Sequence, residues 1–495
     1  MNMIHRMNSG AGGLTKRAWF QTVAGGVYGA ALASLFQREF GVARADPSGT
    51  PVLGPALRHR LEPRATHFPA RAKSVIQLFM NGGPSQMDLL DPKPELTKRH
   101  GQSYFNAIAG EVENIGSAGA ILRSPFQFRQ YGESGLAVSE LLPHLAQRAD
   151  DLAVLRGMYT TNLTHEPALN IIQSGQMRTG YPAMGSWIVY GLGSENQNLP
   201  AYVVLDDPEG LPVNGIENWT AGFLPPVYQG TRFRSRGQPV LNLRPDPADP
   251  PRLAQAARNF LADFDRRHLA AHPHQPALEA RISSYELAGR MQLAAGDALD
   301  VDREDPATRA LYGIGQTPTD SYGRRCLIAR RLVERGVRFV QIFINGQIWD
   351  HHTGIEAGLK AACLKTDQPM AALLTDLKQR GLLDSTLVVW GGEFGRLPIA
   401  QLSEDRNEQN VGRDHNKNAF TTWMAGGGVR RGMVHGATDE LGMAAVSGRV
   451  SVPDWHATIL HLLGLNHEEL FFERNGLPER LTGVNPVRIV SELLA

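Results

Sequence analysis

The sequence has little cysteine and no excess of charge of either sign. Its 495 residues include only two cysteines, Cys326 and Cys363, and neither lies in a CxxC pair or beside a histidine at the spacing of zinc ligands. Such a pair is typical of two free thiols rather than of a functional site. The net charge is +1, with basic and acidic residues interspersed, so the chain lacks the basic footprint of a nucleic-acid-binding protein.

Two common signatures of catalysis are also missing. No G-x-S-x-G motif occurs, which weakens the case for a serine hydrolase. The glycine-rich stretch GGGVRRG at Gly426–Gly432 does not have the spacing of a phosphate-binding loop. With 42% hydrophobic and 20% charged residues, the composition is that of a globular protein. The length predicts two or three structural units, or one large α/β domain with insertions.

The first 45 residues predict an export signal. A basic stretch at Thr15–Gln21 precedes an apolar run at Thr22–Phe36, and the small residues Ala43 and Ala45 form an A-x-A cleavage site. The apolar run is too short and too rich in glycine for a membrane span. We therefore expect the export machinery to carry this protein to the periplasm or the extracellular space, tethered to the membrane if the signal stays uncleaved.

The basic stretch TKRAWFQ resembles a twin-arginine signal, although Lys16 replaces the first arginine and Trp19 replaces the phenylalanine. This departure leaves the ordinary secretory route open. The mature chain is expected to begin near Asp46. Residues 46–73 carry scattered prolines without periodicity, and they predict a linker that either tethers the folded part or wraps its surface.

Short apolar runs between helical patterns predict the fold of residues 74–495. Apolar strands that alternate with helices are typical of an α/β fold, in which a mainly parallel sheet has helices on both faces. A stretch at about 225–317 has long helical patterns and no convincing strand, so we expect a helical insertion there. The strands are expected at Ser74–Met80, Leu152–Met158, Ala201–Asp206, Val337–Ile344, Ser385–Gly391 and Ala419–Gly427, and the clearest helices at Tyr322–Arg335, Gly358–Arg380 and Pro453–Leu463.

Carboxylates and imidazoles gather where the predicted strands end. In an open parallel sheet, ligands bind beyond the carboxyl ends of the strands, so these side chains are expected at one edge. Mixed carboxylate and imidazole ligands suit zinc, manganese or iron better than calcium. The sequence therefore predicts a divalent metal site. Its candidate ligands are Asp88, Asp350, His352, Glu393, Asp414 and His415, with His165 beside them.

Five segments of the sequence, which contain most of these candidate residues, resemble the motifs of one family. FMNGGPSQMDLLDPKP, HEPALNIIQSGQ, WDHHTG, GGEFGRLP and GRDHNKNAFTTWMAGG are similar to the motifs of an exported bacterial family known as domain of unknown function 1501. The likeness covers roughly residues 73–494. That family is placed with sulfatases and alkaline phosphatases, so the resemblance implies an alkaline phosphatase-like fold with a metal-dependent site.

The resemblance also implies roles for single residues. The nucleophile of the superfamily starts a helix ten residues before a glycine, and here His165 stands ten residues before Gly175. The metal-binding loop of aspartate and histidine is similar to Asp350 with His352, and the last ligand histidine, which precedes a strand, is similar to His415. A histidine at the nucleophile position departs from the serine, threonine or formylglycine of the superfamily.

Two further positions depart from the superfamily pattern. The first strand ends in Asn81 where a metal-binding aspartate is usual, and Asp88 is a substitute for it. Where the superfamily has aspartate and histidine after a strand, this chain has Glu393 and Phe394, so one imidazole is missing. Arg396, in the same loop, is expected to hold the non-bridging oxygens of an ester in a bidentate fork.

Each candidate also has a purely structural interpretation. Asp88 suits a turn, Glu393 suits an ion pair with Arg396 on the surface, and Asp414 suits the bracing of a loop. For His165 three roles stay open. We favour a metal ligand, and the alternatives are a nucleophile and a residue that braces the loop.

The sequence thus leads to two hypotheses. The first is an exported, sulfatase-like, metal-dependent hydrolase of sulfate or phosphate esters with a small-molecule or glycan substrate, in which His165 and Arg396 serve catalysis. The second is a non-catalytic exported protein of the same fold that binds a polysaccharide, an envelope partner or a metal. Fold alone does not separate them.

Overall fold

The computed structural model describes residues 61–113, 115–234, 251–272, 275–344, 346–403 and 410–495. All described residues belong to one compact unit. The predicted export signal and the first part of the predicted linker, residues 46–60, lie outside the described residues. None of the described helices combines the length and the apolar character that crossing a membrane requires.

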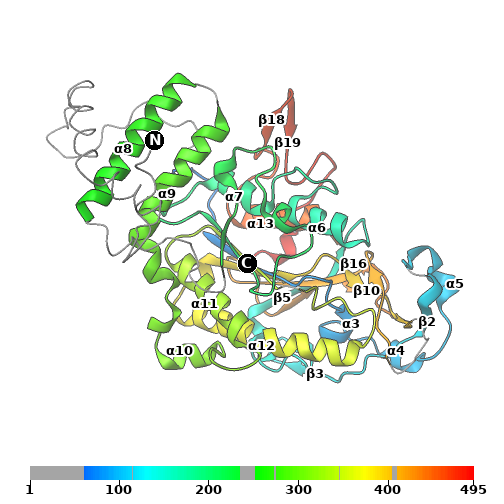
Figure 1. The fold of residues 1–495 in the computed structure, drawn as a ribbon. Coiled ribbons are helices and arrows are strands. Elements are labelled where there is room, and N and C mark those ends of the chain that lie inside the picture. Colours follow the sequence, from blue (N-terminus) through cyan, green and yellow to red (C-terminus); the bar gives the residue numbers. More distant parts are fainter. Residues whose placement is uncertain (1–60, 114, 235–250, 273–274, 345, 404–409) are drawn as a thin grey trace, which may run out of the picture. The chain divides into compact units, whose positions relative to one another are not determined.

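A nine-stranded sheet runs through the described part of the chain (Figure 1). Its strands follow the order β14-β5-β13-β9-β1-β8-β6-β7, and β17 also pairs with β5. All six predicted strands are confirmed as members of this sheet. The members are β1 (Ser74–Phe79), β5 (Leu152–Tyr159), β6 (Tyr202–Leu205), β7 (Thr231–Phe233), β8 (Phe339–Phe343), β9 (Thr386–Gly391), β13 (Phe420–Ala425), β14 (Met433–His435) and β17 (Val450–Ser451).

One strand of this sheet runs against the others. β13 pairs antiparallel with β5 and β9, whereas the remaining pairings of the described strands in this sheet are parallel. The first residue of β13, Phe420, lies opposite Met158 near the carboxyl end of β5. The amino end of β13 therefore shares an edge with the carboxyl ends of β1, β5, β8 and β9. We call it the carboxyl edge.

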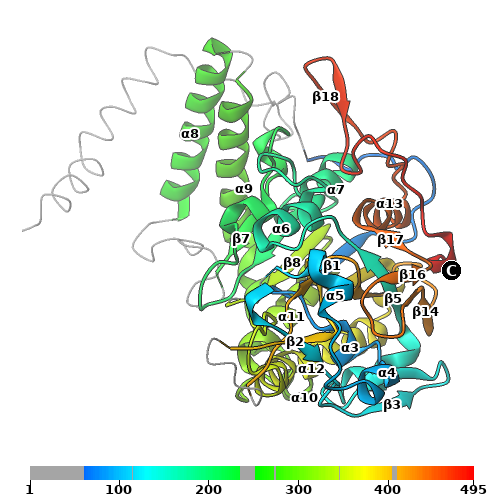
Figure 2. The same ribbon diagram turned by 90° about the vertical axis from the view of Figure 1, so that its right-hand side faces the viewer.

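Helices cover both faces of the sheet. Successive side chains of a strand point to opposite faces, so β1 places Ile76 and Leu78 in one apolar core and Val75 and Phe79 in another. The predicted α/β fold with a mainly parallel sheet is thereby confirmed. The helices are α11 (Asp320–Glu334) and α12 (Ile355–Gln379) on the first face, and α6 (His165–Ser174), α7 (Met184–Leu192) and α13 (Val452–Leu462) on the second (Figure 2).

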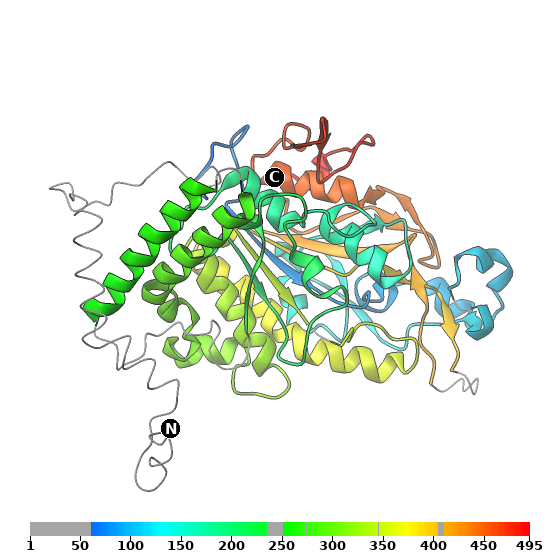
Figure 3. The same ribbon diagram turned by 45° about the horizontal axis from the view of Figure 1, so that its top comes forward.

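The stretch predicted as a helical insertion contains α8 (Pro251–Ala271), α9 (Pro276–Leu299) and α10 (Pro306–Leu311). α8 and α9 lie side by side (Figure 3). The expectation that this stretch holds no strand is wrong, because β7 adds to the edge of the sheet beside β6. A strand of three residues is too short to give a periodic signal in the sequence.

The described end of the linker wraps the surface of the fold. Residues 61–73 form no helix or strand. Their backbone is nevertheless bound, since the N–H of His67 donates to Gly464 O at 2.9 Å and that of Arg71 donates to Leu462 O at 2.9 Å. Both acceptors stand at the carboxyl end of α13. Of the two roles left open by the sequence, the surface wrap is the one that residues 61–73 have.

A smaller set of elements lies beyond the carboxyl edge. β10 (Gly395–Arg396) pairs with β12 (His415–Asn416), and β11 (Ile399–Gln401) pairs with β2 (Ala118–Ile121). A separate apolar core joins β2 and β11 to α3, α4 and α5. The remaining helices and strands are α3 (Gln86–Leu89), α4 (Pro94–Lys98), α5 (Phe105–Ile108), β3 (Phe128–Tyr131), β4 (Leu136–Ser139), β15 (Ala437–Thr438), β16 (Ala445–Ser447), β18 (Phe472–Arg474) and β19 (Leu477–Glu479), with single turns of 3-10 helix between several of them.

Candidate metal centre

Three histidines and one aspartate come together at the carboxyl edge. His165 starts α6 after the loop that follows β5, Asp350 and His352 follow β8, and His415 stands in β12 just before β13. One nitrogen or oxygen of each side chain lies within 4.8 Å of those of the other three. Because β13 is antiparallel, the residue that precedes it arrives at the same edge as the residues that follow the parallel strands.

The two ends of α6 fix the position of His165. Thr164 at the N-cap has extended backbone angles, φ −94° and ψ 139°, so the helix begins at His165. Gly175 ends the helix in the left-handed conformation at φ 73°, where a Cβ atom would lie 2.0 Å from Leu481 O. Glycine meets both requirements because it has no Cβ atom. The imidazole of the first helical residue is therefore held in place at the carboxyl edge.

Asp350 is the side chain on which the three imidazoles converge. Its Oδ1 lies 3.0 Å from His352 Nε2 and 3.2 Å from His415 Nε2. Its Oδ2 lies 3.3 Å from His165 Nε2, without the alignment of a hydrogen bond, so this buried nitrogen has no hydrogen-bond partner. A cation between these atoms would accept the lone pair of that nitrogen.

The outer nitrogen of each ring, Nδ1, lies against a side-chain oxygen. The three contacts are His165 to Glu393 Oε1 at 2.8 Å, His352 to Gln401 Oε1 at 2.5 Å, and His415 to Glu113 Oε2 at 2.7 Å, the last short but poorly aligned. Carboxylate and amide oxygens accept hydrogen bonds, so Nδ1 carries the proton and the Nε2 lone pair points inward. Histidines that bind a metal show this arrangement, because the outer oxygen fixes the ring.

Carboxylates surround the three rings. Four carboxylates contact the rings or their backbone, those of Asp350, Glu393, Glu113 and Asp414. The guanidinium of Arg396 forms an ion pair with Asp350. Glu393 is fully buried against His165, and a buried carboxylate is unfavourable without a positive or hydrogen-bonding partner.

The pKa values reflect the contacts between the imidazoles and the carboxylates. Burial lowers the pKa of His165, but its contacts with Asp350 and Glu393 outweigh burial and raise the pKa to about 9. Burial also lowers the pKa of His352, and its hydrogen bond with Asp350 reverses that shift to a net rise. Burial raises the pKa of Asp350, yet the three imidazoles and Arg396 hold it far below its usual value. The imidazoles of His165 and His352 thus bind a proton more readily than usual, and the ionised carboxylate of Asp350 is stabilised by the positive charge beside it.

The donor set fits a divalent metal. Three imidazole nitrogens and one carboxylate oxygen that face a common point are ligands that zinc, manganese or iron take in proteins. The centre has an open side, because the side chain of His352 is 35% exposed and that of Asp350 is 18% exposed. Solvent and small molecules therefore reach the group from this side.

Arg396 does not face a substrate, and its predicted role as an anion clamp is corrected. Its side chain is 1% exposed, and it donates to Gly83 O at 2.9 Å, to Arg413 O at 3.0 Å and to Asp350 Oδ1 at 2.6 Å. Each guanidinium nitrogen is thus engaged inside the protein. Arg396 therefore holds Asp350 in place, and it is too buried to bind the oxygens of an ester.

Glu393 is not one of the four residues whose ligand atoms converge, but it contacts one of them. Its fully buried carboxylate accepts the N–H of Gly82 at 3.0 Å and binds His165 Nδ1 at 2.8 Å. The surface ion pair with Arg396 that the sequence allowed is absent from the described contacts of both residues. In this geometry Glu393 orients His165 rather than joining the four inner ligands.

Asp88 stands apart from the cluster. It forms a buried ion pair with Arg413 at 2.8 Å and accepts the hydroxyl of Ser85 at 2.5 Å. Both charged side chains are 0% exposed, and removing one partner of such a pair costs about 3–5 kcal/mol. Its position after β1 suggested a metal ligand. The structure instead shows that Asp88 ties the loop after β1 to the segment before His415.

Asp414 joins two backbone segments. Its Oδ1 accepts the N–H of His415 at 2.8 Å, and its Oδ2 accepts the N–H of Glu113 at 3.0 Å. It thereby brings Glu113 to His415, and the three side chains form a second group whose ligand atoms lie within 4.8 Å of one another. This is the bracing role that the sequence left open for Asp414.

Glu113 and Gln401 are site residues that sequence reasoning missed. Glu113 follows a single turn of 3-10 helix, η1 (Ala109–Glu111), and lies 301 residues from Asp414 in the chain. Gln401 ends β11, a strand of three residues. Neither residue follows one of the long apolar strands, which were the signal that revealed the other candidates.

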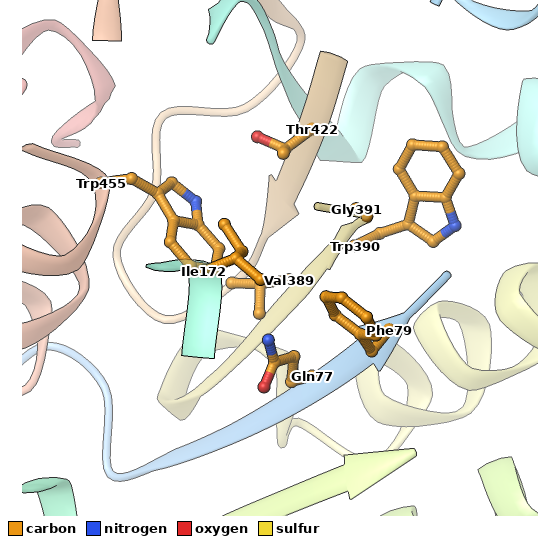
Figure 4. A pocket seen from close by; sticks show the side chains of 9 residues that line it. Gln77, Phe79, Ile172, Val389, Trp390, Gly391, Thr422 and Trp455 are labelled. Atoms are coloured by element: carbon orange, nitrogen blue, oxygen red, sulfur yellow. The ribbon is translucent and has the colours of Figure 1, made fainter. Parts of the chain in front are cut away.

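A small cavity lies under the face of the sheet that carries α6 and α13 (Figure 4). Its volume of about 10 Å³ has room for about one water molecule. The hydroxyl of Thr422 and the indole N–H of Trp455 line it and have no hydrogen-bond partner among the described residues. The cavity is too small for a substrate, so the metal cluster is the candidate functional site.

Residues 72–494 match the family described as Protein of unknown function (DUF1501). The chain belongs to this family. The resemblance indicated by the five sequence motifs is thereby confirmed. A comparison with curated proteins finds no match.

Solved structures similar to this DUF1501 protein include the lipoteichoic acid synthase LtaP from Listeria monocytogenes, a sulfatase from Pseudoalteromonas sp. and a phosphonate monoester hydrolase from Silicibacter pomeroyi. Their sequence identities to the chain are 11%, 14% and 11%, and their TM-scores are 0.31, 0.35 and 0.32. The matches cover 84%, 80% and 80% of this chain and 76%, 69% and 73% of the other chains. At such low scores, the function has to follow from the site itself.

Replacing His165 by alanine is expected to lower metal affinity by at least about a hundredfold, because one of three imidazole ligands is lost. Elemental analysis after metal loading and dialysis measures the effect. His144→Ala is the matched control, since the side chain of His144 is exposed and outside the cluster. Full metal content in His165→Ala would exclude the ligand role, and a phosphoryl group trapped on the wild-type ring would make His165 the nucleophile.

Replacing Glu113 by alanine is expected to lower metal affinity about tenfold to a hundredfold, because His415 loses the oxygen that fixes its ring. Glu113→Gln should retain most of the affinity, since an amide oxygen still accepts from Nδ1. Titration with a competing chelator gives the affinities, and Glu133→Ala, at an exposed position, is the control. Equal affinities for Glu113→Ala and the wild type would contradict this role.

Proposed function

We propose that this DUF1501 protein is a metal-dependent hydrolase of sulfate or phosphate esters. The observation that supports the proposal is the convergence of three imidazole nitrogens on one carboxylate at the carboxyl edge, with an open side toward solvent. Ligands of open α/β sheets bind at this edge. A site with these donors and this opening suits chemistry on a bound molecule better than a structural role.

The side chains that would hold the metal are those of Asp350, His165, His352 and His415. A divalent metal held by these residues would supply Lewis-acid polarisation of a bound ester and would make a nearby water molecule more acidic. Arg396 keeps Asp350 in place from the protein side. The buried side chain of Phe394 packs against the rings of His165 and His415, with centroid distances of 5.0 and 4.3 Å.

In the proposed reaction, the oxygen of water bonds to sulfur or phosphorus, the bond from that atom to the alcohol oxygen breaks, and the alcohol leaves with a proton. Glu113 is the carboxylate with the position to accept the proton of the water. Its side chain is 36% exposed, one oxygen binds His415, and the other lies 3.5 Å from the Thr164 hydroxyl. The ring of His165 has a carboxylate against each nitrogen, so we propose that it is a ligand and not the nucleophile.

A non-catalytic binding protein of the same fold is the second candidate. The burial of Arg396 favours it, because the described residues then offer the cluster no accessible guanidinium for an anionic ester. Such an ester would be held by the metal with little help from the protein. Metal content measured together with turnover separates the two candidates.

The metal-loaded protein is expected to release para-nitrophenol from its sulfate or phosphate esters, to lose this activity in a chelator, and to regain it with zinc, manganese or iron. The release rate before chelation, after it and after each metal is restored measures the effect. His144→Ala should behave like the wild type, and His165→Ala should stay inactive. Stoichiometric metal with no turnover on a broad panel of esters would favour the binding protein.

We also propose that the chain is exported through the signal in its first 45 residues. The A-x-A site at Ala43 and Ala45 predicts a mature chain that begins near Asp46. N-terminal sequencing of the native protein from fractionated cells tests this. An intact Met1 in the cytoplasmic fraction would contradict export, and an uncleaved chain in the membrane fraction would make the apolar run an anchor.

A further inference from the structure

We propose that the hydroxyl of Thr164 binds the ester at the metal centre, by donating a hydrogen bond to one of its sulfate or phosphate oxygens. This inference rests on the proposed function, because it names a residue that contacts the substrate of the same centre. The hydroxyl is a neutral donor, and it stands in for the guanidinium of Arg396, which is only 1% exposed and is engaged inside the protein.

Thr164 stands at the N-cap of α6 without capping the helix. A threonine in this position usually accepts the N–H of the second or third helical residue. The side chain of Thr164 makes no such hydrogen bond. One of the two usual partners is missing from the sequence, because the third helical residue is Pro167, which has no N–H. The helix therefore does not use this hydroxyl.

The backbone of Thr164 is held on both sides. Its N–H donates to Asn162 Oδ1 at 2.8 Å, and its carbonyl accepts the N–H of Ala168 at 3.1 Å. A single torsion, χ1, separates this backbone from the hydroxyl oxygen, and a β-branched side chain has few favourable χ1 values. The hydroxyl oxygen is thus restricted to a few positions, whereas its proton can still rotate.

These positions border the metal centre. His165 is the next residue, and the Cα atoms of consecutive residues are about 3.8 Å apart. The hydroxyl oxygen lies 3.5 Å from Glu113 Oε1, while Glu113 Oε2 lies 2.7 Å from His415 Nδ1. Thr164 is exposed, and the side chain of Glu113 is 36% exposed. The hydroxyl is therefore accessible to a molecule that binds at the centre from solvent.

The contact with Glu113 leaves the hydroxyl available for an ester. Its length of 3.5 Å exceeds the usual O–H···O distance of about 2.7–2.8 Å. A sulfate or phosphate oxygen can approach to the usual distance, and a hydrogen bond to a charged acceptor is short and strong. When the proton of Thr164 turns to the ester, Glu113 Oε1 becomes free to accept the proton of the attacking water.

Two cations near the centre already have partners within the protein. Arg396 binds Asp350 and backbone carbonyls. The ammonium of Lys417 lies 3.0 Å from Glu111 Oε2. Each would have to give up an ion pair in order to bind an ester, whereas Thr164 only has to rotate its hydroxyl proton. For this reason we assign the contact with the ester to Thr164.

The test uses the full-length, metal-loaded protein with inorganic phosphate as the probe. Calorimetry measures the Kd of phosphate for the wild type, Thr164→Val and Thr164→Ser. Valine keeps the shape of threonine without the hydroxyl, so the affinity should fall about tenfold as a hydrogen bond to a charged acceptor is lost. Serine restores the hydroxyl and should restore the affinity. Thr179→Val is the matched control, because Thr179 is exposed and outside the cluster.

Metal content and turnover are measured on the same samples. Elemental analysis should show full metal occupancy in all three variants. With para-nitrophenyl sulfate and para-nitrophenyl phosphate, kcat/KM should fall about tenfold or more in Thr164→Val and recover in Thr164→Ser. Thr179→Val should match the wild type in both measurements.

Each outcome decides a separate point. Equal phosphate affinity in Thr164→Val and the wild type overturns the contact, and so does a wild type that binds no phosphate. Loss of metal from Thr164→Val, or a phosphoryl group trapped on the Thr164 hydroxyl, replaces the contact by a structural or a nucleophilic role. The expected affinities without turnover of any ester keep the contact and refute the hydrolase. Turnover with an unchanged kcat/KM in Thr164→Val keeps the hydrolase and overturns the contact.

Discussion

The carboxylate of Asp350 is the contact on which the site depends. Three imidazoles approach it from three different parts of the chain, and Arg396 binds it from the protein side. Without that carboxylate, the guanidinium would keep a buried charge with no counter-ion, and the rings would lose their common partner. The loops after β5 and β8 and the segment before β13 are therefore held together by one side chain. Their arrangement at the carboxyl edge follows from this shared contact.

The direction of β13 makes that arrangement possible. A parallel strand would carry the residue before it to the opposite edge of the sheet, away from Asp350. The apolar pattern of β13 revealed a strand in the sequence but not its direction, because the same residues suit both. The strands β1, β5, β6, β8 and β9 were predictable because they are buried on both faces, and such strands have continuous apolar sequences. β7, β14 and β17 have only two or three residues each, and no pattern of burial could reveal them.

The site was predictable where a residue borders a long strand. His165, Asp350, His352 and His415 all do, and the structure brings all four together. Asp88 gave the same signal and lies elsewhere, because its partner is a buried arginine far away in the sequence. Position beside a strand fixes where a side chain starts, whereas its partner is fixed by tertiary packing. For that reason the side chains that contact the Nδ1 atoms of the three rings could not be predicted from the sequence.

The outer contacts also explain the electrostatics of the centre. Glu393 and Glu113 fix two rings through their Nδ1 atoms, and each brings a negative charge with it. An amide oxygen fixes the third ring without charge, as Gln401 does for His352. Burial lowers the pKa of His165, and its contacts with Asp350 and Glu393 raise it to about 9; burial raises the pKa of Asp350, and the three imidazoles and Arg396 bring it below its usual value. Protons and a metal cation therefore compete for the same lone pairs.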